Sequence, residues 1–154
     1  MPTRRLANRL AAISAVAFVI ACGSNSPTTP PAATPTPAPV MTLLSQGSSS
    51  NLPSLTFHWV SFTTVSTGRI DVTVDWTFAT DTVWLVVAPG TETCYDGQRL
   101  NLSICNVIVS LDDATKPKKL SLPGQPAGTY TLYIRNRGPN TEAISWQVFV
   151  TTPG

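Results

Sequence analysis

Titratable and metal-binding side chains are scarce in this 154-residue chain. It contains one histidine, His58, and three cysteines, and only 12% of its residues are charged. A catalytic or zinc site needs several such groups to converge on one point. The chain also lacks a nucleophile elbow, an HExxH pair and a glycine-rich phosphate loop. These absences argue against an enzyme, so we expect no catalytic residue, and we expect no cofactor.

The one apolar run near the N-terminus is too short to span a membrane. Residues 10–21 are apolar except for Ser14, and Arg4, Arg5 and Arg9 precede them. A helix of this length covers about 18 Å, whereas the hydrocarbon core of a bilayer is about 30 Å thick. A basic start followed by a short apolar run is typical of a secretory signal. We therefore predict a signal peptide over residues 1–21.

The signal ends in "VIAC", residues 19–22, which resembles the bacterial lipobox. The resemblance implies that the Cys22 thiol is acylated and that cleavage just before it makes Cys22 the first mature residue. The alternative is an ordinary signal peptide with an incidental cysteine. Lipidation predicts a protein held in the bacterial cell envelope. Gly23 is not the aspartate associated with inner-membrane retention in many Gram-negative bacteria, which favours the outer membrane in such a host.

Removal of the predicted signal peptide changes the net charge of the chain from positive to slightly negative. Residues 1–21 carry three of the ten basic residues, so seven remain against eight acidic ones and the net charge becomes −1. The densest mature basic cluster is Lys116, Lys118 and Lys119, which we interpret as a solvated edge. A basic footprint is the first requirement for binding nucleic acid. We therefore expect no nucleic-acid partner.

Cys94 and Cys105 remain as a pair if Cys22 carries lipid. Disulfides persist in exported proteins, so we expect a bridge between them, and two unpaired buried thiols are the alternative. Their spacing matches no zinc pattern. Asp112 and Asp113 form only a weak candidate for a cation loop, because calcium needs six or more oxygen ligands.

Residues 22–43 read as a lipidated cysteine followed by a linker rich in proline and threonine, without charge. Proline fixes φ and cannot donate a backbone hydrogen bond, so this segment favours an extended polyproline II spacer. The composition changes after it. We place a folded domain at residues 44–154, with "GSSSN" at 47–51 as a second flexible joint or the first loop of the domain.

Period-two alternation dominates the domain. Residues 69–78, "RIDVTVDWTF", alternate apolar and polar side chains, which predicts a strand with one buried face. Similar runs occur at 54–62, 83–87, 104–111, 118–122, 128–136 and 143–150. The side chains expected to face the core are Leu55, Phe57, Trp59, Ile70, Val72, Val74, Trp76, Phe78, Val83, Leu85, Val87, Tyr130, Leu132, Ile134, Ile144, Trp146, Val148 and Val150.

Turn residues such as Pro89-Gly90 and Asp96-Gly97 separate these runs, and no stretch has a sustained helical period. Many short strands between turns predict an all-β fold, an antiparallel β-sandwich or jelly roll of about seven or eight strands. We expect substitutions at Trp76 and Trp146 to damage folding most.

The runs "GRIDVTVDWTFATDTVWLVVAPG" and "PAGTYTLYIRNRGP" resemble the bacterial pre-peptidase C-terminal domain over residues 65–151. The resemblance implies a non-catalytic module of exported proteins. Some relatives bind calcium through acidic loop residues. Here the acidic second strand is "TDTVWLVV", which retains only Asp81, so the resemblance leaves open whether this chain binds calcium.

Aromatic side chains that stack on sugars are the remaining candidates for a site. Trp84, Tyr95 and Tyr133 are the candidate ligand-binding residues, and the alternative is that they cover the second sheet or the linker. We expect a non-catalytic binding module anchored to the membrane by lipid, with an envelope protein or glycan as ligand. A structural subunit of an envelope assembly, docked through an edge strand, is the alternative. A small hydrolytic enzyme is less favoured.

Overall fold

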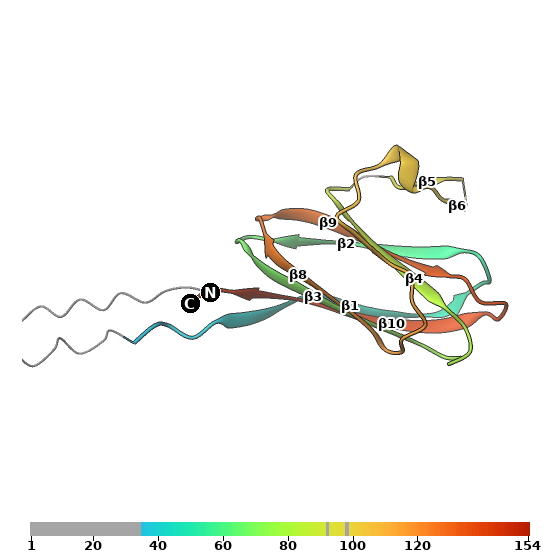
Figure 1. The fold of residues 1–154 in the computed structure, drawn as a ribbon, viewed down its shortest axis with the longest axis horizontal. Helices are drawn as coiled ribbons and strands as arrows, with labels where there is room; N and C mark the ends of the chain where they lie inside the picture. The colour runs from blue at the N-terminus through green and yellow to red at the C-terminus, as the bar shows by residue number, and fades with distance from the viewer. Residues whose placement is uncertain (1–34, 92, 98) are drawn as a thin grey trace, which may run out of the picture. The chain divides into compact units, whose positions relative to one another are not determined.

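A computed structural model describes residues 35–154 except 92 and 98 (Figure 1). Its elements are β1 (Val40–Leu52), β2 (Phe57–Thr64), β3 (Gly68–Trp76), β4 (Val83–Pro89), β5 (Tyr95–Asp96), β6 (Arg99–Leu100), the 3-10 helix η1 (Leu102–Ile104), β7 (Val109–Leu111), β8 (Lys118–Gln125), β9 (Gly128–Asn136) and β10 (Glu142–Thr152). Within these residues no helix is long and apolar enough to cross a membrane. The predicted signal peptide and Cys22 lie outside the described residues.

Eight strands form two four-stranded antiparallel sheets packed face to face. Sheet A has the order β1-β10-β3-β8 and sheet B has the order β2-β9-β4-β7. Consecutive strands cross from one sheet to the other, except that β4 and β7 pair with each other. This is the strand order of a jelly roll, and the prediction of an all-β sandwich is confirmed.

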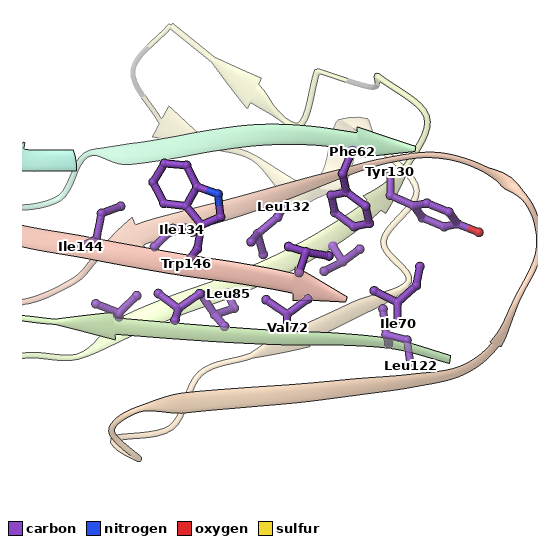
Figure 2. Packing of buried hydrophobic residues seen from close by; sticks show 14 of the residues in the cluster. Phe62, Ile70, Val72, Leu85, Leu122, Tyr130, Leu132, Ile134, Ile144 and Trp146 are labelled. Atoms are coloured by element: carbon purple, nitrogen blue, oxygen red, sulfur yellow. The ribbon is translucent and has the colours of Figure 1, made fainter. Parts of the chain in front are cut away.

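The core between the sheets is built from the inward residues of the alternating strands (Figure 2). Ile70, Val72 and Val74 of β3 are at most 1% exposed, and Leu132 and Ile134 of β9 are fully buried. The same holds for the predicted inward faces of β4 and β10. Period two therefore identified the buried face wherever the opposite face was polar.

Phe78 was predicted to be buried but is 45% exposed, because β3 ends at Trp76. The backbone N–H groups of Thr77 and Phe78 both donate to the carboxylate of Glu142, at 2.7 and 3.0 Å. Glu142 is itself fully buried. A buried carboxylate is stable only when donors such as these bind it. The two hydrogen bonds to Glu142 therefore fix the backbone where it leaves β3, and Phe78 points outward.

The predicted inward face of residues 55–59 is wrong. Leu55 and Trp59 are 59% and 51% exposed, while Phe62 of β2 is 4% exposed in the main core, with Val60 packed against it. Both faces of this strand carry large apolar residues, so alternation alone did not distinguish them. Cross-strand pairing with β9 places Phe57 and Trp59 on the outer face of sheet B.

Two predicted boundaries shift. The predicted strand at 104–111 shortens to β7, because Cys105 is bonded to Cys94 and the preceding residues form η1. The predicted domain start at residue 44 and the "GSSSN" joint both lie inside β1. That strand begins at Val40 because β10 extends far enough to pair with it, Val40 opposite Thr152.

The lysine cluster is not a uniformly solvated edge. Lys118 is fully buried and its ammonium donates to the carbonyl of Val83. Burial lowers its pKa, partly offset by Asp113 and Asp112. Only Lys119 of the three points freely into solvent, because the Lys116 ammonium lies 3.6 Å from the Asp75 carboxylate.

Candidate functional site

A second, smaller core lies on the outer face of sheet B. Residues 93–97 and 99–107 fold back over this face, and the Cys94–Cys105 disulfide, whose Cα atoms are 5.2 Å apart, closes this segment. The predicted disulfide is thus confirmed. Figure 1 shows the β5–β6 hairpin on the outer side of β2 and β9. Val86 and Ala88 of β4 are buried beneath it, together with Leu100 of the hairpin itself.

Cross-strand neighbours define the surface under this cover. One row across β2, β9 and β4 is Phe57, Arg135 and Trp84, and the next is Trp59, Tyr133 and Val86. Side chains opposite each other in antiparallel strands lie about 5 Å apart at Cβ, close enough for aromatic rings to touch. Sheet B therefore assembles aromatic residues that are distant in sequence.

Three rings join the hairpin to the sheet. The Phe57 ring centroid lies 5.1 Å from that of Tyr95 and 6.0 Å from that of Tyr133, and the Tyr95 and Tyr133 centroids are 6.4 Å apart. The Tyr133 hydroxyl accepts a hydrogen bond from the backbone N–H of Cys94 at 3.1 Å. This packing holds Tyr95 against β2 and leaves one side of its ring facing a groove.

The groove runs along β2 on both sides of Trp59 and Tyr95. Its larger part, about 470 Å³, lies between the β1–β2 turn, β2 and the hairpin, and its smaller part, about 270 Å³, lies between β2 and the start of the hairpin segment. Trp59 and Tyr95 line both parts. The polar residues that line them are Ser49, Asn51, Thr56, His58, Ser61, Thr91, Thr93 and Thr131. We call this surface the aromatic groove.

His58 lines the groove from the edge of the sandwich. Its ring packs on Trp146 with 4.9 Å between centroids, and burial lowers its pKa below the ordinary value of 6.5. His58 is therefore neutral at pH 7, with a ring nitrogen available as either donor or acceptor. His58 thus lies against the core and also lines the groove.

The three predicted ligand-binding aromatics have different places. Tyr95 lines the groove. Tyr133 is 1% exposed and forms its floor, so it presents little surface to a ligand. Trp84 lies outside the groove, where the guanidinium carbons of Arg135 and Arg137 are each 5.8 Å from its ring and its indole N–H donates to Ser110. The ring faces of Trp84 are thus contacted by cations.

Trp59 and Phe57 were missed as groove residues because they were assigned to the core. One signal was available in the sequence. The residues between and beyond them, His58, Val60 and Phe62, form an alternative apolar face that ends in a phenylalanine. Only the pairing of β2 with β9 decided between the two faces.

Buried polar groups hold the β1–β2 turn that forms one end of the groove. The Asn136 side chain, fully buried, donates to the carbonyls of Leu52 at 3.1 Å and Asn140 at 2.6 Å. Asn140 in turn donates to the carboxylate of Asp81, from its backbone and its side chain. Such a connected network fixes the position of the turn relative to β9.

The weak cation candidates have other partners. Asp112 pairs with Arg137, and Asp113 lies 3.6 Å from Lys118. A hydrogen bond from the Thr115 backbone N–H is the main cause of the lowered pKa of Asp113. Across the described part of the chain, no three His, Cys, Asp or Glu side chains come together in a way that could hold a metal ion.

Comparison with known proteins leaves the family open. No family model matches this chain. No curated protein matches it. The resemblance to the pre-peptidase C-terminal domain therefore stays a prediction. Among solved structures, the chain is similar to the crystal structure of the Yersinia pseudotuberculosis-derived mitogen, with 13% identity and a TM-score of 0.48 over 76% of this chain and 88% of that one.

Proposed function

We propose that this chain is a lipid-anchored protein of the bacterial cell envelope whose β-sandwich is a non-catalytic module that binds envelope glycan in the aromatic groove. The observation that carries the proposal is Trp59, a tryptophan 51% exposed beside Tyr95 in a groove edged by hydroxyl and amide groups. Aromatic faces pack against the C–H faces of sugar rings, while neighbouring polar groups bind the hydroxyls.

The place of the groove supports this reading. The described chain enters the domain at Val40, at one end of β1, and the groove begins at the turn after Leu52, at the other end. Thirteen strand residues at about 3.3 Å each separate these points by about 40 Å. A domain tethered at its entry point would present the groove on the side away from the anchor.

The glycan proposal is tested by substituting Trp59 with alanine in the full-length protein. We expect Trp59→Ala to weaken binding to glycans selected on an oligosaccharide array by tenfold or more, measured by isothermal titration calorimetry. Phe78→Ala is the matched control, because Phe78 is an exposed aromatic outside the groove. Equal affinities of Trp59→Ala and the parent protein would refute the groove as the binding site.

The anchor is tested separately. We expect Cys22→Ser to move the protein from the membrane fraction to the soluble fraction, with an unchanged circular dichroism spectrum, because the acylated thiol is lost and the domain is untouched. A variant that stays in the membrane fraction would rule out Cys22 as the point of attachment.

A second candidate function, a structural subunit of an envelope assembly, is favoured by β1. This strand is at the edge of sheet A, and its first residues Val40, Met41 and Leu43 are 56%, 64% and 42% exposed. Exposed apolar edge strands favour pairing with another chain. Met41→Lys would then abolish co-purification of a partner and leave glycan binding intact.

A further inference from the structure

We infer that Arg99, Arg135 and Leu55 form an anion-binding subsite next to the aromatic groove, so that the glycan ligand carries carboxylate or phosphate groups. This inference rests on the proposed function and specifies its ligand class. The three residues line a hollow of about 380 Å³ together with Ser54 and Thr56. Thr56 also lines the aromatic groove, so the two hollows are contiguous.

The positive charges of Arg99 and Arg135 are not paired with a carboxylate of the described residues. Among the described residues, Arg69, Lys116, Lys118 and Arg137 pair with carboxylates, whereas Arg99 and Arg135 do not. Asp96 is the cross-strand neighbour of Arg99, yet the two form no ion pair. Arg137 is paired with Asp112, so it does not compete for the ligand.

Arg135 has an unused donor. Its Nε–H is buried and has no hydrogen-bond partner in the described part of the chain. Buried donors are normally paired, so an unpaired guanidinium N–H calls for an explanation. Its guanidinium is placed by stacking near Trp84 and by the cross-strand contact with Phe57. A guanidinium has five N–H donors whose planar arrangement matches a carboxylate or a phosphate.

The hydroxyls of this hollow are already committed as donors. Ser54 donates to the carbonyl of Gly138 at 2.6 Å, and Thr56 donates to that of Pro53 at 2.8 Å. The donors that remain for a ligand are therefore cationic. This favours an anionic group over a neutral sugar hydroxyl at this position.

Leu55 adds an independent observation. Its φ is +63°, a left-handed conformation that suits glycine or asparagine and is costly for leucine. It occupies the third position of the turn closed by the hydrogen bond from Thr56 N–H to the carbonyl of Pro53, and 59% of it is exposed. An exposed apolar side chain kept on a strained backbone indicates contact with a ligand, here the apolar face of the sugar that carries the anion.

The test uses matched pairs of oligosaccharides with the full-length protein in detergent, by isothermal titration calorimetry. The pairs are galacturonate hexasaccharide with its methyl-esterified neutral form, and phosphorylated mannohexaose with mannohexaose. We expect at least one charged form to bind tenfold more tightly than its neutral partner, with an advantage that shrinks as salt increases. The preferred pair distinguishes a carboxylate from a phosphate source.

Three variants locate the subsite. Arg99→Gln lies on the exposed hairpin, and we expect it to remove most of the charged-form advantage without changing affinity for the neutral form. Lys119→Gln, which removes one positive charge from sheet A, is its control. Leu55→Gly should weaken binding severalfold while the melting temperature stays equal or rises. A loss of melting temperature with unchanged binding would make Leu55 merely structural and remove it from the subsite.

The outcomes separate this inference from the proposed function. Equal affinity for charged and neutral forms, with binding still dependent on Trp59, would overturn the anion subsite and leave the glycan-binding groove standing. A charged-form advantage that survives Arg99→Gln and Arg135→Gln would also overturn it. If neither charged form binds, the inference fails, and the array experiment on Trp59→Ala decides the proposed function by itself.

Discussion

The outer faces of the two sheets differ in the side chains that they carry and in whether another segment covers them. The outer face of sheet A carries apolar side chains near its β1 edge, namely Phe149 with Leu43 and Met41 of β1. Over the rest of the face the side chains are polar or charged, namely Asp71, Thr73, Asp75, Lys119, Ser121, Ser145 and Gln147. The outer face of sheet B carries large rings and aliphatic groups, namely Phe57, Trp59, Trp84, Val86, Ala88 and Tyr133. Only sheet B is covered by the disulfide-closed segment.

The difference shows why the groove on sheet B is lined by aromatic rings, whereas the hollow of about 580 Å³ on sheet A is lined mainly by polar side chains such as Thr73, Asp75 and Gln147. Apolar surface on sheet B is removed from water when residues 93–97 and 99–107 fold over it, which stabilises the domain by about 25 cal/mol for each Å² buried. The cover contacts the edge strand β2 at Phe57, through Tyr95, but it leaves Trp59 half exposed. The groove is the uncovered remainder of the second core on sheet B.

The largest loss of stability should come from substituting a residue of the core between the two sheets. Trp76 is 4% exposed in the main core and its indole N–H donates to the carbonyl of Asp81 at 3.1 Å. We expect Trp76→Ala to lower the free energy of unfolding by about 3–5 kcal/mol, because it leaves a cavity. Urea denaturation followed by circular dichroism measures this. A loss below about 1 kcal/mol would contradict the assignment of Trp76 to the core.

Removing the disulfide should make the two sheets more alike, because it loosens the segment that covers sheet B and leaves sheet A unchanged. We expect Cys94→Ser with Cys105→Ser to lower the free energy of unfolding by about 3 kcal/mol, since the bridge closes a short loop in the unfolded chain. Glycan affinity should fall as well, because Tyr95 loses its support. Amide hydrogen exchange should increase in residues 91–107 and on sheet B, whereas unchanged exchange there would show that the cover holds without the bond.

A smaller loss of stability is expected when one hydrogen bond between the covering segment and sheet B is removed. Tyr133→Phe removes the hydroxyl that accepts the Cys94 N–H and leaves that buried donor without this acceptor. We expect a loss of about 1–3 kcal/mol in the free energy of unfolding. Thr73→Val on sheet A is the control and should change stability by less than about 0.5 kcal/mol. Equal effects of the two variants would mean that the faces do not differ in the way described.

The smallest effect concerns His58 and pH. Because burial lowers its pKa below 6.5, the folded protein binds fewer protons than the unfolded chain between that lowered pKa and 6.5. The free energy of unfolding should therefore fall as pH decreases through this window. Melting temperatures between about pH 7.5 and pH 5 should show the decline, and His58→Gln should flatten it. Asp113, whose pKa is lowered from 3.8, acts only at more acidic pH. A His58→Gln profile that parallels the parent would exclude this origin.

Much of the fold followed from alternation along single strands. Where one face was polar, as in β3 with Asp71 and Thr73, period two identified the buried residues because charged side chains stay in water. The disulfide was predictable as well, since the predicted signal and lipobox would leave Cys94 and Cys105, which are close in sequence, as a pair. The sequence by itself thus determined an all-β sandwich and the inward faces of β3, β9 and β10. In β4 both faces are apolar and largely buried, and the predicted inward residues Val83, Leu85 and Val87 lie in the main core.

Only the tertiary structure decided where the site lies. In β2 both faces are apolar, so the neighbour β9 determined that Trp59 points outward and Phe62 inward. The residues of the aromatic groove and of the proposed anion-binding subsite come from the β1–β2 turn, β2, the hairpin and β9. No local sequence pattern brings these segments together. Long-range pairing places these residues, because the free energy of burying a face depends on which surface covers it.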